Sequence, residues 1–158
     1  MKVYRLTKTQ VLPISMEEAW GYFSNPSNLQ EITPKELRFN VLTNIEHEHM
    51  YAGQIINYIV TPILGIAMRW TTEITHVESG KYFVDEQRFG PYSFWHHKHF
   101  FEPVEGGVLA TDIIDYALPF GFLGRVANRM FVKRQIETIF DFREHKLHEL
   151  FGAMDESY

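Results

Sequence analysis

The sequence predicts a single α+β domain, residues 1–158, with a curved antiparallel β-sheet wrapped around a long C-terminal α-helix. Three observations lead to this fold class. A strand-like N-terminal segment is followed by two helix-start signals, a long central region repeats strand patterns between short turns, and the pattern after residue 121 becomes helical. The central region shows no strand–helix alternation, which excludes a parallel, Rossmann-type sheet.

The first elements are a strand and two short helices. Residues Lys2–Leu12 are rich in β-branched and aromatic residues, as in a strand. Ser15 and Glu18 have the spacing of a capping box, in which each side chain accepts a hydrogen bond from the other residue's backbone amide. Asn25 followed by Pro26 predicts the start of a second short helix, because proline loses no hydrogen bond at the first helical position.

Six further strand candidates fill the centre of the chain, separated by turns rich in glycine and proline. They are Leu37–Leu42, Gln54–Val60, Ile66–Val77, Tyr82–Phe89, Ser93–Glu102 and Val108–Leu118. The breaks that follow residue 60 are short enough for hairpins, so neighbouring strands should pair antiparallel as a meander.

The C-terminal segment repeats apolar residues at the helical period of 3.6. A helix over residues 122–151 would be about 45 Å long, and it can bury its apolar stripe only along the whole sheet. The main stripe consists of Val132, Ile136, Ile139, Phe140, Leu147, Leu150 and Phe151. A second stripe begins with Leu123, Val126, Ala127 and Met130.

Composition narrows the class of protein. Of 158 residues, 45% are hydrophobic and 15% aromatic, which is ample for a core, and there is no cysteine for a disulfide or a thiolate site. The net charge of −5, with no basic run longer than the pair Lys133-Arg134, argues against nucleic acid as the main partner. Residues Met1–Gln10 do not resemble a signal peptide, and Ile55–Met68 is too short and interrupted to span a membrane. We therefore expect a soluble, cytoplasmic protein without stable membrane insertion; its oligomeric state stays open.

Nine short segments, in order along almost the whole chain, resemble one known group of proteins. They are Phe23–Leu29 with Thr33-Pro34, Arg69–Ile74, Phe83–Gln87, Gly90–Tyr92, Trp95–Phe101, Asp112, Tyr116–Pro119, Phe131–Arg134 and Phe140–Arg143. They are similar to the START-like, SRPBCC superfamily, and within it to the bacterial ligand-binding branch described as cell-division-inhibitor-like. The resemblance implies the helix-grip fold. Because the superfamily includes lipid carriers, receptors, polyketide cyclases and oxygenase domains, it does not choose a function.

Two neighbouring strand candidates, Tyr82–Phe89 and Ser93–Glu102, divide their side chains between two faces. The face expected to be solvated carries Val84, Glu86, Arg88, His96, Lys98 and Phe100. The face expected to line a pocket carries Phe83, Asp85, Gln87, Phe89, Trp95, His97, His99 and Phe101. An apolar, aromatic wall with a few short polar groups is typical of a ligand site.

The candidate ligand-binding residues lie on this face, on the preceding strand and at the start of the long helix. They are Arg69, Glu73, Phe83, Asp85, Gln87, Trp95, His97, His99, Phe120, Phe122 and Met130. Arg69 and Glu73 have two interpretations of equal weight, a ligand anchor inside the pocket or an ion network outside it. The glycine-flanked aromatic segment Phe120–Gly124 is a candidate for a mobile pocket mouth.

A metal site is one interpretation of His97 and His99, because two imidazoles on one strand face can chelate zinc. The third ligand could be Asp85, Glu73 or Asp112, and the sequence does not identify which. Two hydrogen-bonded histidines in the pocket wall are the simpler alternative. We therefore expect no metal and no cofactor.

Three functions stay open. The first is a binding protein for an apolar or amphipathic small molecule, such as a lipid, a polyketide or an aromatic compound, held between sheet and helix. The second is a cyclase, dehydratase or isomerase with Glu73, Asp85, His97 or His99 as general acid or base, which requires at least two of these to converge on one cavity. The third, a regulatory protein linked to cell division, follows from the resemblance alone. The sequence favours the first.

Overall fold

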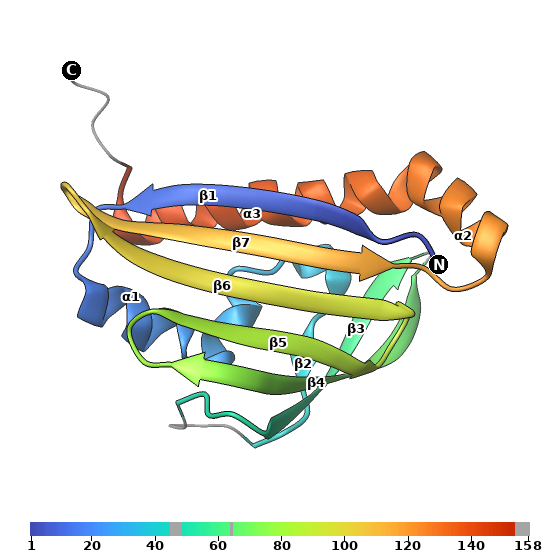
Figure 1. Ribbon diagram of the computed structural model, residues 1–158, viewed down its shortest axis with the longest axis horizontal. Helices are drawn as coiled ribbons and strands as arrows, with labels where there is room; N and C mark the ends of the chain where they lie inside the picture. The colour runs from blue at the N-terminus through green and yellow to red at the C-terminus, as the bar shows by residue number, and fades with distance from the viewer. Residues whose placement is uncertain (45–48, 64, 154–158) are drawn as a thin grey trace.

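The computed structural model describes residues 1–44, 49–63 and 65–153, which form one sheet, one long C-terminal helical segment and a few short helices (Figure 1). The strands are β1 (Tyr4–Leu12), β2 (Asn40–Val41), β3 (Gln54–Ile63), β4 (Ile66–Glu78), β5 (Tyr82–Phe89), β6 (Phe94–Val104) and β7 (Gly107–Ala117). The helices are α1 (Met16–Phe23), the 3₁₀ turns η1 (Pro26–Gln30) and η2 (Lys35–Leu37), α2 (Gly121–Ala127), the π-helical turn η3 (Asn128–Val132) and α3 (Lys133–Phe151).

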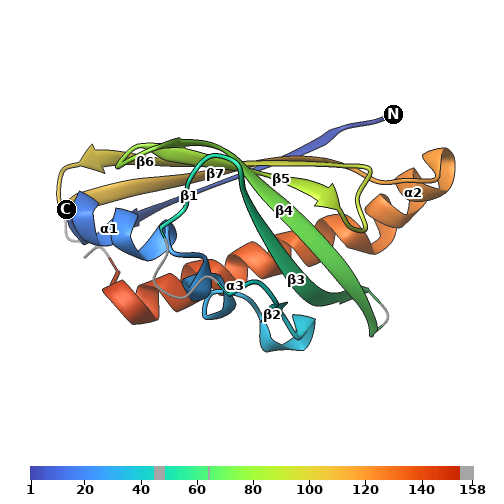
Figure 2. The same cartoon turned by 90° about the horizontal axis from the view of Figure 1, so that it is seen from below.

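All seven strands belong to one antiparallel sheet in the order β1-β7-β6-β5-β4-β3-β2. The predicted meander is therefore confirmed from β3 to β7, and β1 closes the order by pairing with β7. The register shifts between Val60 and Ile63, between Thr71 and Thr72, and between Ile74 and His76. Such irregularities bend a sheet. In Figure 2 the sheet curves around α3, which lies along its concave side.

The two short helices after β1 form for the predicted reasons. The Ser15 hydroxyl accepts a hydrogen bond from the Glu18 amide, and the Glu18 carboxylate accepts one from the Ser15 amide at 2.9 Å. The Asn25 side chain accepts from the Ser27 amide at 3.0 Å, with Pro26 at the first position of η1. The chain thus turns twice and places α1 and η1 against one end of the sheet.

The strand predicted over Leu37–Leu42 is mostly wrong. Lys35–Leu37 form the 3₁₀ turn η2, and the two residues Asn40 and Val41 pair with β3 as β2. The cause is local: Arg38 has a φ of 45°, a left-handed conformation that ends the turn and interrupts an extended chain.

The predicted long helix is present but not uniform, because α2, η3 and α3 follow one another without a break in the chain. The wider π-helical turn contains the buried Asn128, whose side-chain oxygen accepts a hydrogen bond from the Tyr116 hydroxyl at 2.9 Å. The main apolar stripe is confirmed at its buried members Val132, Ile136, Phe140 and Leu147. The second stripe is wrong, because Leu123 and Met130 are exposed.

Three clusters of buried side chains form the core between the sheet and the helices. One joins the α1 end of the sheet to the end of α3, the second lies on β3 and β4, and the third packs β7 against the first part of α3. Members of all three, Phe83, Ile74 and Ile136 among them, also line a cavity. The curvature of the sheet thus leaves space among the clusters. No helix within the described residues is long and apolar enough to cross a membrane.

Candidate functional site

The cavity lies between the concave face of the sheet and α3, and its volume of about 180 Å³ exceeds the roughly 150 Å³ of an engineered cavity that holds benzene. Most of its lining is apolar or aromatic, including Leu29, Phe39, Met50, Tyr58, Val60, Trp70, Ile74, Phe83, Tyr92, Trp95, Ile136, Ile139 and Phe140. The polar lining residues are fewer: Asn25, Asn28, Thr33, Thr72, Asp85, His97, His99, Gln135 and Arg143. This composition is the one expected of a small-molecule site.

Three aromatic rings form one end of the cavity. The Trp70 and Trp95 rings lie 5.2 Å apart and nearly perpendicular, and Tyr92 packs against both at 5.5 and 4.8 Å between ring centres. Gln87 holds Tyr92 in place, because its side-chain amide donates to the Tyr92 carbonyl at 2.7 Å and its oxygen accepts from the Tyr92 amide at 3.2 Å. Gln87 is thus not among the cavity-lining residues; it positions one of them.

Four polar side chains meet where β5, β6 and β7 run side by side, at a place we call the polar end; it adjoins the aromatic rings, since the His97 ring centre lies 6.3 Å from that of Trp95. The His97 and His99 rings lie 3.7 Å apart between their centres, with Asp85 and Asp112 on either side. Asp85 Oδ2 contacts His99 Nε2 at 2.8 Å and His97 Nδ1 at 3.4 Å. Asp112 Oδ1 contacts His97 Nε2 at 2.9 Å and His99 Nδ1 at 2.8 Å. Every imidazole nitrogen therefore faces a carboxylate oxygen.

Burial and mutual charge oppose each other in this cluster. Burial alone would raise the pKa of both carboxyl groups, but the two imidazoles outweigh it, so the pKa of Asp85 is lowered and that of Asp112 is lowered further. Burial, together with the neighbouring His99, lowers the pKa of His97. For His99 the hydrogen bonds to Asp112 and Asp85 outweigh the burial and raise the pKa. The two rings are thus unequal, with His99 the more readily charged.

Arg143 brings a further charge to the cluster from α3. Its side chain is about 10% exposed, its guanidinium lies 4.5 Å from the Phe140 ring centre, and Nη1 lies 3.8 Å from Asp112 Oδ1. Its Nε atom has no hydrogen-bond partner among the described residues. An arginine buried this deeply is rare unless it is paired, and here Asp112 is the paired group.

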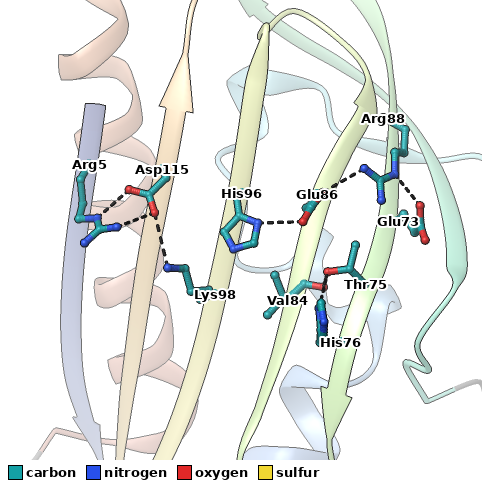
Figure 3. Close-up of polar contacts among 10 residues, drawn as sticks. All are labelled: Arg5, Glu73, Thr75, His76, Val84, Glu86, Arg88, His96, Lys98 and Asp115. Carbon is teal, nitrogen blue, oxygen red and sulfur yellow. Dashed lines mark hydrogen bonds and ion pairs between the residues drawn. The ribbon is translucent and has the colours of Figure 1, made fainter. Parts of the chain in front are cut away.

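The opposite, convex face of the sheet carries the charged residues predicted to be solvated. Figure 3 shows two ion networks there, one in which Arg5 and Lys98 both contact Asp115, and one that runs from His96 through Glu86 and Arg88 to Glu73. The prediction that Glu86, Arg88, His96 and Lys98 lie on the outer face of β5 and β6 is therefore correct. Phe89, expected to face the pocket, is 73% exposed.

Two predicted ligand-binding residues on β4 belong to this outer face. Glu73 pairs with Arg88, and Arg69 is exposed, whereas Trp70 and Thr72 line the cavity. Because side chains alternate along a strand, the inward position of Trp70 requires Arg69 to point outward. Their inclusion in the pocket is wrong, and the alternative of an outer ion network is correct for Glu73.

Phe120, Phe122 and Met130 were also predicted to contact a ligand, but they lie outside the cavity. Their exposed fractions are 81%, 67% and 72%, and the cavity lining does not include them. In Figure 1, α2 extends beyond the end of β7, so its side chains have no sheet to pack against. The expectation of a mobile pocket mouth at Phe120–Gly124 stays a prediction.

Five predicted residues do line the cavity: Phe83, Asp85, Trp95, His97 and His99. Asp85, His97 and His99 also meet the condition that the enzyme hypothesis required, since more than two of its candidate groups converge; Glu73 does not join them. The lining residues that were not among the predicted ligand-binding residues include Tyr58, Trp70, Thr72, Tyr92, Ile136, Phe140 and Arg143. Ile136, Phe140 and Arg143 are spaced at helical intervals. This spacing could have predicted that the three residues share one face of the helix.

Comparison of this chain with known proteins identifies its fold. No family model and no curated protein matches the sequence. Among solved structures, a protein from Chromobacterium violaceum has a TM-score of 0.69 at 13% identity, with 96% of this chain and 99% of that chain covered. A putative uncharacterized protein from Rhizobium leguminosarum has a TM-score of 0.67 at 14% identity, covering 94% and 96%. Major latex-like protein 151 from Panax ginseng has 0.66 at 14% identity, covering 94% and 97%.

The chain has the helix-grip fold. Its structural neighbours are bacterial proteins and plant proteins of the Bet v 1 type, as expected for a START/SRPBCC-type fold. In this fold the curved sheet wraps around α3 (Figure 2). At these identities the likeness concerns architecture, so function has to be argued from the cavity itself.

Proposed function

We propose that this helix-grip protein binds an apolar or amphipathic small molecule in the cavity between its sheet and α3, as a member of the bacterial ligand-binding SRPBCC branch. The observation that carries the proposal is the cavity, whose lining is mostly apolar and aromatic with one polar end. The architecture shared with the plant proteins of the Bet v 1 type supports it, because that fold is associated with binding small ligands.

The distribution of side chains describes the ligand. Trp70, Tyr92 and Trp95 offer flat apolar surfaces at one end, which suits a ring or a planar chain. Asp85, His99 and Arg143 give the polar end hydrogen-bonding groups that can fix a polar substituent. A ligand with an aromatic or fused-ring body and a single polar end would match both parts.

An uncharged fluorescent probe, N-phenylnaphthylamine, tests this proposal. It has an aromatic body and no charge that would draw it to the basic residues of α2 and α3. We expect saturable binding of one probe per protein, with fluorescence enhancement and energy transfer from Trp70 and Trp95. Ile139 lines the cavity from α3, so Ile139→Trp should fill the space and weaken binding by about tenfold or more, which is about 1.4 kcal/mol.

Two variants control the experiment. Ile113→Trp adds the same ring on the outer face of β7, opposite Lys98, and should bind the probe as the wild type does. Phe122→Ser removes one exposed aromatic residue of α2 and should also leave binding unchanged. Equal binding by the wild type and Ile139→Trp, or loss of binding in Phe122→Ser, would place the probe outside the cavity and contradict the proposal.

A further inference from the structure

Three metal-ligating side chains from adjacent strands converge at the polar end of the cavity. Asp85, His97 and His99 each offer one ligand atom, and the three atoms lie within 4.8 Å of one another. His97 and His99 lie on β6, and Asp85 lies directly across from His97 on β5. The strand register therefore supplies the third ligand that the sequence alone did not identify.

Asp112 fixes the direction in which the two rings present their nitrogens. Its Oδ1 atom lies 2.9 Å from His97 Nε2 and 2.8 Å from His99 Nδ1, so both of these nitrogens can donate to it. In that tautomer the remaining nitrogens, His97 Nδ1 and His99 Nε2, carry lone pairs and face Asp85 Oδ2. A carboxylate that holds the far nitrogen of a metal-ligating histidine is the usual outer-shell partner of such sites.

Three electron-pair donors that face one another need a positive charge between them. They lie in a mostly buried region, where bulk water can screen their repulsion only weakly. Two imidazoles and one carboxylate match first-row transition metals, whereas Mg²⁺ and Ca²⁺ prefer oxygen ligands throughout. Because all three residues line the cavity, a cation held by them would keep coordination positions open toward the cavity.

We propose that Asp85, His97 and His99 form a binding site for one divalent first-row transition-metal cation, with Asp112 as the residue that positions both imidazoles. This metal proposal is independent of the proposal that the cavity binds an apolar ligand. The residues that would hold the cation are different from Trp70, Tyr92 and Trp95, which form the aromatic end of the cavity. The cation would place a Lewis acid at the polar end of the cavity.

Two of the separations between the ligand atoms can be compared with those of a zinc site. In a tetrahedral zinc site, bonds of about 2.0–2.1 Å place neighbouring ligand atoms about 3.3 Å apart. Asp85 Oδ2 and His97 Nδ1, at 3.4 Å, already have this separation. Asp85 Oδ2 and His99 Nε2, at 2.8 Å, have the separation of a hydrogen bond and must open by about half an ångström.

Calorimetric titration of chelator-treated protein with Zn²⁺ tests the proposal, and Co²⁺ adds a spectroscopic readout. We expect saturable binding of one Zn²⁺ per protein, and a Co²⁺ absorption spectrum typical of nitrogen and oxygen ligands in fewer than six positions. Asp85→Asn and His99→Gln should abolish both. Asp112→Asn should weaken binding about 10- to 100-fold without abolishing it, because it removes an outer-shell charge and leaves the ligands in place.

His96 provides the matched control, since it lies on the same strand and pairs with a carboxylate, Glu86, on the outer face. His96→Gln should bind Zn²⁺ as the wild type does, and circular dichroism and thermal melting establish that each variant is folded. The absence of saturable binding in the wild type, with Zn²⁺ and with Co²⁺, would overturn the proposal and leave a proton as the charge between the donors. Equal binding by the wild type and Asp85→Asn would overturn it as well. The Ile139→Trp variant should bind Zn²⁺ as the wild type does. Failure of the metal proposal can therefore be told apart from failure of the ligand proposal.

Discussion

The side chains that matter most in this molecule are charged groups held out of water by their partners. On the concave side, two histidines lie between Asp85 and Asp112, and Arg143 approaches Asp112 from α3. Removing a single partner from such a set leaves a buried charge uncompensated, which is more costly than the loss of an exposed pair. On the convex side, most of the paired side chains are partly exposed and contribute less, whereas Asp115 is buried.

Asp115 on the convex side should make the stability of the protein depend on pH. Hydrogen bonds from Arg5, at 2.7 and 2.8 Å, together with the charges of Arg5 and Lys98, lower the pKa of Asp115 against a smaller opposing effect of burial. Since the folded pKa lies below the unfolded one, this stabilisation is complete above the unfolded pKa and is lost as the pH falls through the folded pKa. Asp115→Asn should therefore unfold at a lower urea concentration than the wild type at pH 7, and the difference should shrink in acid.

Asp141→Asn is the comparison for this measurement. Asp141 also pairs with a basic residue, Lys8 at 2.8 Å, but both side chains are more exposed than Asp115. Its effect at neutral pH should be smaller than that of Asp115→Asn. A difference between the wild type and Asp115→Asn that stays constant from neutral to acid pH would contradict the account.

At the scale of elements, two glycines in helices have opposite roles. A Cβ atom at Gly124 of α2 would lie 2.1 Å from the Pro119 carbonyl oxygen and 3.1 Å from the Leu118 Cβ, so the helix can approach the end of β7 only with glycine there. A Cβ atom at Gly21 of α1 would meet nothing within 4 Å. Gly124 is required by packing, whereas Gly21 only adds freedom to the unfolded chain.

Alanine substitutions should separate these two roles. Gly124→Ala should lower the free energy of unfolding by about 1–3 kcal/mol, because backbone atoms have to move. Gly21→Ala should raise it by up to about 1 kcal/mol, because alanine favours the helix. Urea denaturation of both variants gives the two values. Similar effects of the same sign would contradict the assigned contacts of Gly124.

The elements also show how far sequence reasoning reaches. Alternation in β5 and β6 correctly separated His97 and His99 from His96 and Lys98, because a period of two divides the faces of any strand. The same rule could not say which face of β4 looks inward, since both faces carry polar residues there. Across α2 and η3, the period of 3.6 grouped Leu123 with Met130, but it could not reveal that both side chains are exposed. Periodicity defines a face; the neighbouring element decides whether that face is buried.

At the scale of the whole molecule, the arrangement of the sheet and α3 explains why only some of the cavity-lining residues could be predicted from the sequence. The cavity depends on the bends in β3, β4 and β5, which curve the sheet around α3, and no residue pattern gives the size of the remaining space. Arg143 was missed because a charged residue in a helix is normally exposed, and only the position of Asp112 across the interface makes its burial possible. Asp85 was among the candidates, but its place opposite His97 depends on register.

The central claim is that a small molecule binds in the cavity between the sheet and α3 and not on the exposed residues Phe120, Phe122 and Met130. A crystal structure of the protein with N-phenylnaphthylamine tests this claim most directly. The account predicts electron density for one probe between Trp70 and Trp95 on the sheet and Ile139 on α3. Density confined to Phe120, Phe122 and Met130, with the cavity unchanged, would contradict it.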